Sequence, residues 1–269
     1  MAEFIHFFQK QVEKPGLFSL YHIIWLVVII GATILISYVF RNCSKKTYKR
    51  IILIGWIILL ILEVIKQIVK SFYYGDPSYF KYSFYHLPFH LCSTIYYIVP
   101  VLVFTDSEKH KALHDAFTGF MCFFVLYAGI GVVCYNDIVM STLLYTNIQT
   151  MVHHGMQVVL GVFMICWNRK TINFKTFLRG LIVLGIFTVL AIIVNVIIEP
   201  ISDGIDMFYV NPLRVTSLPI INVVQEKYGF IPYLIVYLLI NVALAFITYS
   251  VSMLIIHKFN FKELFIMEK

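Results

Sequence analysis

The sequence predicts an all-helical integral membrane protein that folds as a single bundle of about seven transmembrane helices. Of its 269 residues, 60% are hydrophobic and only 13% are charged, and the mean hydropathy is +0.85. Soluble domains contain about 45–50% apolar and about 25% charged residues. A water-soluble chain of this length could not bury so many apolar side chains. The composition also excludes collagen-like, disordered and disulfide-scaffold proteins.

Seven segments are long and apolar enough to cross a bilayer, which requires about 20 residues of helix. They are residues 17–40, 51–70, 84–104, 113–134, 147–167, 181–199 and 230–256. In residues 1–16, phenylalanines alternate with charged side chains, which indicates a short interfacial helix. Residues 257–269 are expected to form a cytoplasmic tail, and residues 17–256 form one domain without internal repeats.

Lys and Arg gather on alternate connections between the predicted spans. With the N-terminus outside, 14 basic residues fall on the cytoplasmic side and 6 on the outer side. This asymmetry predicts an N-out, C-in, multi-pass protein of the cell membrane. It also accounts for the net charge of +7, so we expect membrane lipids and not nucleic acid as partners. The sequence gives no indication of the oligomeric state.

The connection between the last two spans, residues 201–229, is unusually long. Loops of that length without structure are uncommon in compact domains. We therefore expect this segment to form a lid, or a partly re-entrant segment, on the outer face.

Polar residues inside the predicted spans concentrate in the outer half of the bundle. Because a charged side chain near the bilayer centre costs about 2.5–3.5 kcal/mol, they predict one polar cavity that opens outward. Glu63 and Lys66 are three residues apart on one helix, and the alternative to substrate contact is that they only neutralise each other. The residues expected to bind substrate or support the cavity are Glu63, Lys66, His153, Gln157, Asn195 and Arg214.

The third span begins with a concentration of reactive side chains. Pro88 is expected at its first helical position, which places His90 and Cys92 in the first turns, where the helix dipole stabilises a thiolate. A thiolate beside an imidazole is the usual activated cysteine nucleophile. The alternative is that Cys92 is only a small buried hydrophobic residue.

The fifth span carries His153 and His154 side by side. Adjacent residues on a helix point about 100° apart, so we expect at most one of them to face Cys92. No His-x3-His or His-Glu-x-x-His spacing is present, and we therefore expect neither a metal nor another cofactor.

At these positions the sequence resembles the bacterial YwaF family of integral membrane proteins. The matching pieces run in family order. They are Glu63-x-x-Lys66-Gln67, Leu87 to Cys92, His154-Gly155, Asn195, Met207 to Pro212, and Gly229 to Tyr233.

That family is similar in fold to a eukaryotic transmembrane acyltransferase that remodels ether phospholipids, and to androgen-induced hydrolases of fatty-acid esters. The resemblance implies a histidine at His154 that works with a cysteine. In the acyltransferase the cysteine directly precedes the first histidine, and Phe89 stands at that position here. Cys92 follows three residues later.

These observations favour a lipid acyltransferase or acyl-ester hydrolase that acts in the outer half of the bilayer. Cys92 would attack the acyl carbonyl, and His154 would act as general base and then acid. His90 or Lys66 would stabilise the developing negative charge. The alternatives are a non-catalytic protein that binds or transports a lipid or small solute, and a structural or immunity-type membrane factor.

Overall fold

The computed structural model describes residues 2–73, 76–137, 139–202 and 204–258. Within these residues, six helices are long and apolar enough to cross a membrane. They are α2 (Leu20–Phe40), α3 (Lys45–Lys70), the continuous helix Lys111–Cys134, α7 (Leu144–Asn168), α8 (Phe174–Ile198) and α10 (Phe230–Lys258). The predicted class, a helical multi-pass membrane bundle, is confirmed, while the count of seven spans and their orientation remain predictions. Nearly all of the predicted tail lies outside the described residues.

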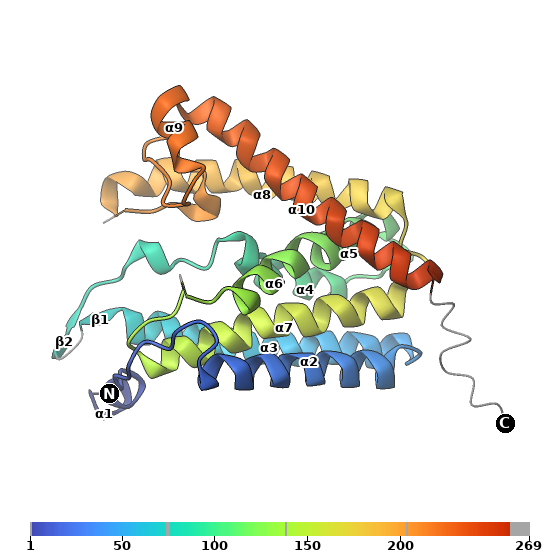
Figure 1. The fold of residues 1–269 in the computed structure, drawn as a ribbon, viewed down its shortest axis with the longest axis horizontal. Helices are drawn as coiled ribbons and strands as arrows, with labels where there is room; N and C mark the ends of the chain where they lie inside the picture. The colour runs from blue at the N-terminus through green and yellow to red at the C-terminus, as the bar shows by residue number, and fades with distance from the viewer. Residues whose placement is uncertain (1, 74–75, 138, 203, 259–269) are drawn as a thin grey trace.

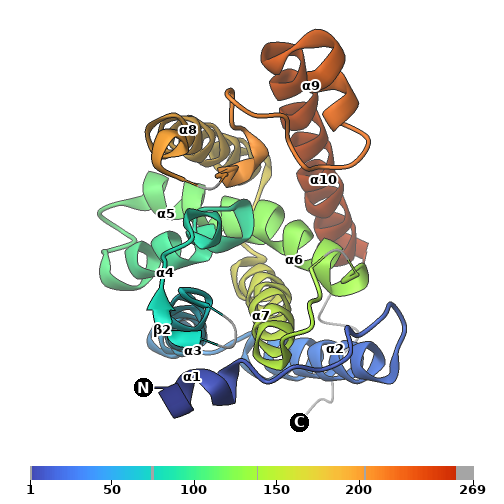
Figure 2. The same cartoon turned by 90° about the vertical axis from the view of Figure 1, so that its left-hand side faces the viewer.

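The helices form three layers (Figures 1 and 2). Helix α7 lies between α2 and α3 in one outer layer, and α8 and α10 form the other, with α10 crossing at an angle. The middle layer contains α4 (Ile95–Phe104), α5 (Lys111–Gly119) and α6 (Leu126–Cys134), which contact helices on both sides.

The third predicted span is shorter than its hydropathy indicated. Its helical part covers only Leu91–Phe104, starting with the 3-10 turn Leu91–Thr94 that continues into α4. The expectation that Pro88 is the first helical residue is wrong, because His90 occupies the N-cap position. Proline disfavours helical backbone at the residue before it, so the chain from Phe84–His86 to His90 winds irregularly before the helix begins.

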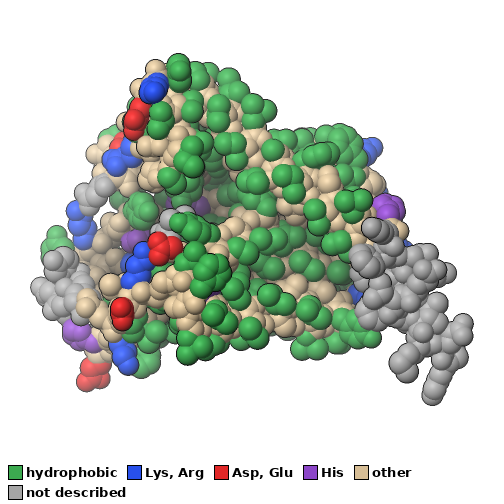
Figure 3. All heavy atoms as spheres, viewed as in Figure 1, with side chains coloured by type: hydrophobic (Ala, Val, Ile, Leu, Met, Phe, Trp, Pro, Cys, Tyr) green, Lys and Arg blue, Asp and Glu red, His purple; other side chains and the backbone are tan. Residues whose placement is uncertain are grey.

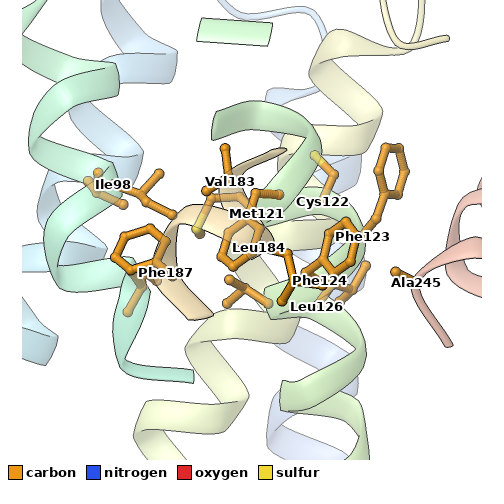
Figure 4. Close-up of a cluster of buried hydrophobic side chains, with 14 of the residues drawn as sticks. Ile98, Met121, Cys122, Phe123, Phe124, Leu126, Val183, Leu184, Phe187 and Ala245 are labelled. Carbon is orange, nitrogen blue, oxygen red and sulfur yellow. The ribbon is translucent and has the colours of Figure 1, made fainter. Parts of the chain in front are cut away.

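The fourth span contains a widened turn. A π-helical segment, Phe120–Val125, joins α5 to α6, and all six of its residues are buried. Its side chains form the centre of the apolar core together with Phe187 on α8 (Figure 4). The ring of Phe120 stacks on those of Phe124 and Phe187, with centroids 5.3 and 5.9 Å away. These contacts pack the middle layer against α8.

The outer faces of α2, α8 and α10 carry exposed apolar side chains, for example Ile34, Ile197 and Leu254, each more than 60% exposed. Figure 3 shows this apolar surface over the length of the molecule, with charged side chains towards the two ends. Apolar surface of this extent is the mark of contact with lipid.

At one end of the bundle lie α1, the segment that follows α3 and the segment that follows α8. Helix α1 (Ala2–Phe8) lies there, next to an antiparallel hairpin that the sequence did not predict, β1 (Phe72–Tyr73) and β2 (Asp76–Phe80). The long segment after α8 is folded: it contains a 3-10 turn, Met207–Tyr209, and α9 (Asn222–Tyr228).

Candidate active site

Three potential ligands or catalytic groups meet where the turn before α4 contacts α7. The Sγ atom of Cys92 and a ring nitrogen from each of His153 and His154 all lie within 4.8 Å of one another, and both histidines are buried. Cys92 and His154 are therefore neighbours. They follow the first residues of their predicted spans, Phe84 and Asn147, by eight and seven positions. The expectation that only one histidine faces Cys92 is wrong. The two rings lie nearly perpendicular with centroids 5.0 Å apart, which lets both reach the thiol.

Gln157 fixes the orientation of His154. Its side-chain Nε2 donates to the Cys92 carbonyl at 2.9 Å, so its Oε1 faces His154 Nδ1 at 3.3 Å. An amide oxygen only accepts hydrogen bonds. This network assigns the proton of neutral His154 to Nδ1 and leaves the lone pair on Nε2.

His153 is held by a second chain of hydrogen bonds. The Tyr96 hydroxyl donates to Glu63 Oε2 at 3.3 Å and lies 3.0 Å from His153 Nδ1. The Tyr96 hydroxyl thus connects the buried Glu63 carboxylate to the ring of His153. Sequence reasoning missed Tyr96, although it follows Cys92 by four residues, about one helical turn.

Glu63 and Lys66 form the ion pair that their spacing predicts, with Nζ 2.7 Å from Oε1. Gln67 Nε2 donates to the same carboxylate and to the His86 carbonyl, both at 2.6 Å. Gln67 thereby connects the end of α3 to the irregular segment before α4, beside the buried Glu63, which is only 4% exposed.

His90 is not one of the three clustered residues, and its ring faces the segment after α8. Its Nδ1 is buried without a hydrogen-bond partner among the described residues, and its ring packs against Tyr209 with centroids 5.3 Å apart. Phe208 and Tyr209 both have left-handed backbone, with φ of 57° and 59°. Non-glycine residues adopt this conformation only where surrounding contacts impose it.

Asn195 supplies one of those contacts. Its side-chain amide pairs with both backbone groups of Met207, accepting from the nitrogen at 2.7 Å and donating to the oxygen at 2.9 Å. Asn195 therefore anchors the strained turn to α8 and indirectly positions Tyr209 beside His90.

Arg214 also lies in the segment after α8 and is engaged there. Its guanidinium donates to Glu199 Oε1 at 3.0 and 3.2 Å, and the other oxygen of Glu199 accepts from Asn211 Nδ2 at 2.8 Å. Arg214 thus pairs with Glu199 in the segment after α8 and is not part of the Cys92–His153–His154 group.

Gly129 on α6 allows a close helix contact directly behind the site. A Cβ atom there would lie 2.8 Å from Gln157 Cβ and 3.0 Å from the His154 backbone oxygen.

An apolar cavity of about 320 Å³ opens between α6, α7 and α10, with Ile130, Val162 and Ile256 among its lining residues.

No curated protein and no solved structure shows significant similarity to the chain. A family model does match, and it covers residues 17–259, which include every predicted span and every predicted site residue. The name YwaF, which the sequence resemblance suggested, is not the one this match carries. The multi-pass membrane chain described here belongs to the TMEM164 family.

Proposed function

We propose that this protein is a membrane-embedded acyltransferase or acyl-ester hydrolase that uses Cys92 as nucleophile and His154 as general base. The observation that carries the proposal is the approach of Cys92 Sγ to a His154 ring nitrogen within 4.8 Å, with Gln157 directing the unprotonated Nε2 away from itself. A nucleophile, a base and a group that orients the base form the arrangement typical of covalent catalysis.

The reaction follows from these groups. His154 Nε2 takes the thiol proton as Cys92 attacks the ester carbonyl of a lipid, and a tetrahedral oxyanion forms. Its collapse breaks the bond to the alcohol oxygen, which takes the proton from His154 and leaves a thioester on Cys92. Water or an acceptor hydroxyl then attacks the thioester while His154 removes its proton. The bond to Cys92 Sγ breaks, and the thiolate takes the proton back from His154. Water gives hydrolysis and the hydroxyl gives acyl transfer.

The surroundings suit a lipid substrate. The cavity between α6, α7 and α10 is lined mostly by apolar side chains, together with Arg169, Thr248 and Ser252. Its residue Ile130 directly follows Gly129, which packs against Gln157. An acyl chain in this cavity would extend from the depth of the site towards the opposite end of the bundle. His90, with its unpartnered ring nitrogen, and Lys66 are the groups proposed to stabilise the oxyanion, and Arg214 is proposed to meet a lipid phosphate.

Phe89 favours the second candidate, a lipid-binding or transport protein without chemistry. It stands where the related acyltransferase has its cysteine, and its ring packs among Tyr97, Phe187 and Phe208 with centroids 5.6 to 6.0 Å away. That position contributes to the aromatic core, so any thiol chemistry depends on Cys92 alone.

The two candidates differ in whether a thioester forms. We would incubate the purified protein in nanodiscs with phospholipids that carry an alkyne-tagged acyl chain, and measure hydroxylamine-sensitive tagging together with lipid products. Tagging should be lost in Cys92→Ala and reduced at least about 100-fold in His154→Ala, while Cys134→Ala, which removes an exposed thiol, should behave as wild type. Lipid binding without tagging in the wild type would establish the second candidate.

A further inference from the structure

We propose that Cys92, His153 and His154 also form a zinc site, and that the bound ion withdraws the Cys92 thiolate from acyl chemistry. The binding part of this inference stands on the geometry of the cluster, whereas the inhibition rests on the proposed function. The sequence patterns led us to expect no metal, because adjacent histidines are not a familiar ligand spacing. In the folded chain the third ligand is Cys92, which lies in the turn before α4.

The donor set is one that zinc prefers. Thiolate sulfur binds the ion at about 2.3 Å and imidazole nitrogen at about 2.0 Å, usually in a tetrahedral arrangement. Ligand atoms in such a site are therefore roughly 3.3–3.6 Å apart. The three atoms here lie within 4.8 Å of one another, so a contraction of about 1 Å, achievable by rotating side chains, would form the site.

Each histidine has a polar contact at Nδ1. His154 Nδ1 is bonded to Gln157 Oε1, and His153 Nδ1 lies 3.0 Å from the Tyr96 hydroxyl, which can donate or accept. In the tautomers with both Nδ1 atoms protonated, both Nε2 atoms carry lone pairs, and one thiol proton satisfies only one of them. A cation satisfies both and also the sulfur, and it releases the thiol proton to solvent.

The contacts behind the histidines resemble the outer shell of zinc sites. Ligating histidines usually donate their other ring N–H to a carboxylate or another acceptor, which fixes the ring. Here Glu63 acts on His153 through Tyr96, and Gln157 acts on His154. Three protein ligands leave a fourth position for water or an anion, as in zinc sites that remain open.

Zinc and substrate would compete for the same sulfur. Once the thiolate coordinates the ion and both Nε2 atoms are occupied, no free nucleophile or base remains. Zinc should therefore suppress thioester formation on Cys92, and a chelator should restore it.

The test uses the full chain in nanodiscs and two readouts, zinc affinity by competition with a chelating dye, and the absorption of Co²⁺ as a zinc substitute. We expect one equivalent of metal and a thiolate-to-cobalt charge-transfer band that is absent in Cys92→Ser. Affinity should fall at least about 100-fold in His153→Gln and in His154→Gln, and about tenfold or more in Tyr96→Phe. Cys134→Ser, which removes an exposed thiol, should bind as wild type.

Thermal unfolding of each variant without metal would show whether it is folded. Equal zinc affinity for the wild type and a folded Cys92→Ser variant, or a charge-transfer band that survives this substitution, would overturn the zinc site. Thioester formation unaffected by zinc would overturn the inhibition and leave the enzyme proposal standing. Zinc binding in a protein that forms no thioester would instead overturn the enzyme proposal and leave the metal site.

Discussion

Gln157 Oε1 lies 3.3 Å from His154 Nδ1 one helical turn away on α7. The same amide is held by the Cys92 carbonyl, so one side chain connects the proposed base to the backbone of the proposed nucleophile. Gln157 is thus placed as a positioning residue, because it sets which nitrogen of His154 is free.

Gln157→Leu should lower the reactivity of Cys92. Without the amide, His154 can place its proton on Nε2 and can no longer accept the thiol proton. Small losses of alignment at a catalytic group cost about 100-fold, so we expect alkylation of Cys92 by iodoacetamide to slow about 10- to 100-fold, with a changed pH profile. Peptide mass spectrometry would measure it, with the exposed Cys134 in the same sample as internal reference. An unchanged rate and profile would mean that His154 does not activate the thiol.

Breaking the Glu63–Lys66 pair on one side should destabilise the protein strongly. Glu63 is buried and the pair is only slightly exposed, so Glu63→Gln or Lys66→Met leaves a charge without its partner, at a cost of about 3–5 kcal/mol. The double variant should cost less than the sum of the two. Unfolding in detergent would measure these differences.

The exposed pair Lys14–Asp137, with 3.6 Å between charged atoms and both side chains nearly half exposed, is the matched control. Lys14→Met should cost no more than about 1 kcal/mol. Single variants of Glu63 and Lys66 that cost as little as this control would show that water reaches the pair.

Hydropathy predicted six of the helices because crossing a bilayer requires a long apolar run, a property of each segment alone. It overestimated the segment before α4, since 84–90 is apolar and aromatic yet interrupted by Pro88. The π-helical segment Phe120–Val125 packs against α8, and the hairpin packs against α3. Both depend on these contacts, which no local sequence pattern predicts.

The position of the candidate site was likewise predictable from the sequence, but the orientation of its side chains was not. Cys92 and the two histidines follow the predicted starts of their spans by six to eight residues, which is why the sequence placed them together. The direction of each ring does not follow from such counting, because it depends on Tyr96 of α4 and on Gln157, whose own orientation is set by its hydrogen bond to the Cys92 carbonyl. The expectation that only one histidine faces Cys92 was wrong because it considered the direction of each residue on the helix and not the rotation of its side chain.

Gly129→Ala should disturb both stability and the site. The added Cβ would lie 2.8 Å from Gln157 Cβ and 3.0 Å from a backbone oxygen of α7, so α6 and α7 must separate. Overpacking of this kind costs about 1–3 kcal/mol, and it should shift the Gln157 amide that orients His154. Thermal unfolding and Cys92 alkylation measure the two effects.

Gly131→Ala provides the control on the same helix. A Cβ atom at Gly131 meets nothing within 4 Å, and alanine favours helix over glycine by about 1 kcal/mol. This variant should be as stable as the wild type or more stable. If the two variants were equally stable, α6 and α7 would not be in close contact at Gly129.

Asp206 should make the stability of the protein depend on pH. It lies in the segment after α8, where one carboxylate oxygen accepts from the Asn211 backbone nitrogen at 3.0 Å and the other has no hydrogen-bond partner among the described residues. Burial raises the pKa of Asp206 from 3.8 to about 6. The folded state therefore holds this proton more tightly than the unfolded state does.

The sign follows from linkage. Below pH 4 the group is protonated in both states and its favourable contribution is complete. As the pH rises through 6, the folded protein must ionise a buried carboxyl group, and that contribution, roughly 3 kcal/mol at most, is lost. Asp206→Asn is neutral at every pH and should remove this slope. Unfolding of both proteins in detergent between pH 4 and 8 would measure the difference, and the stability of wild type relative to Asp206→Asn should fall as the pH rises. A relative stability that stays constant or increases would mean that Asp206 is ionised in the folded protein throughout this range, with water or a cation at its second oxygen.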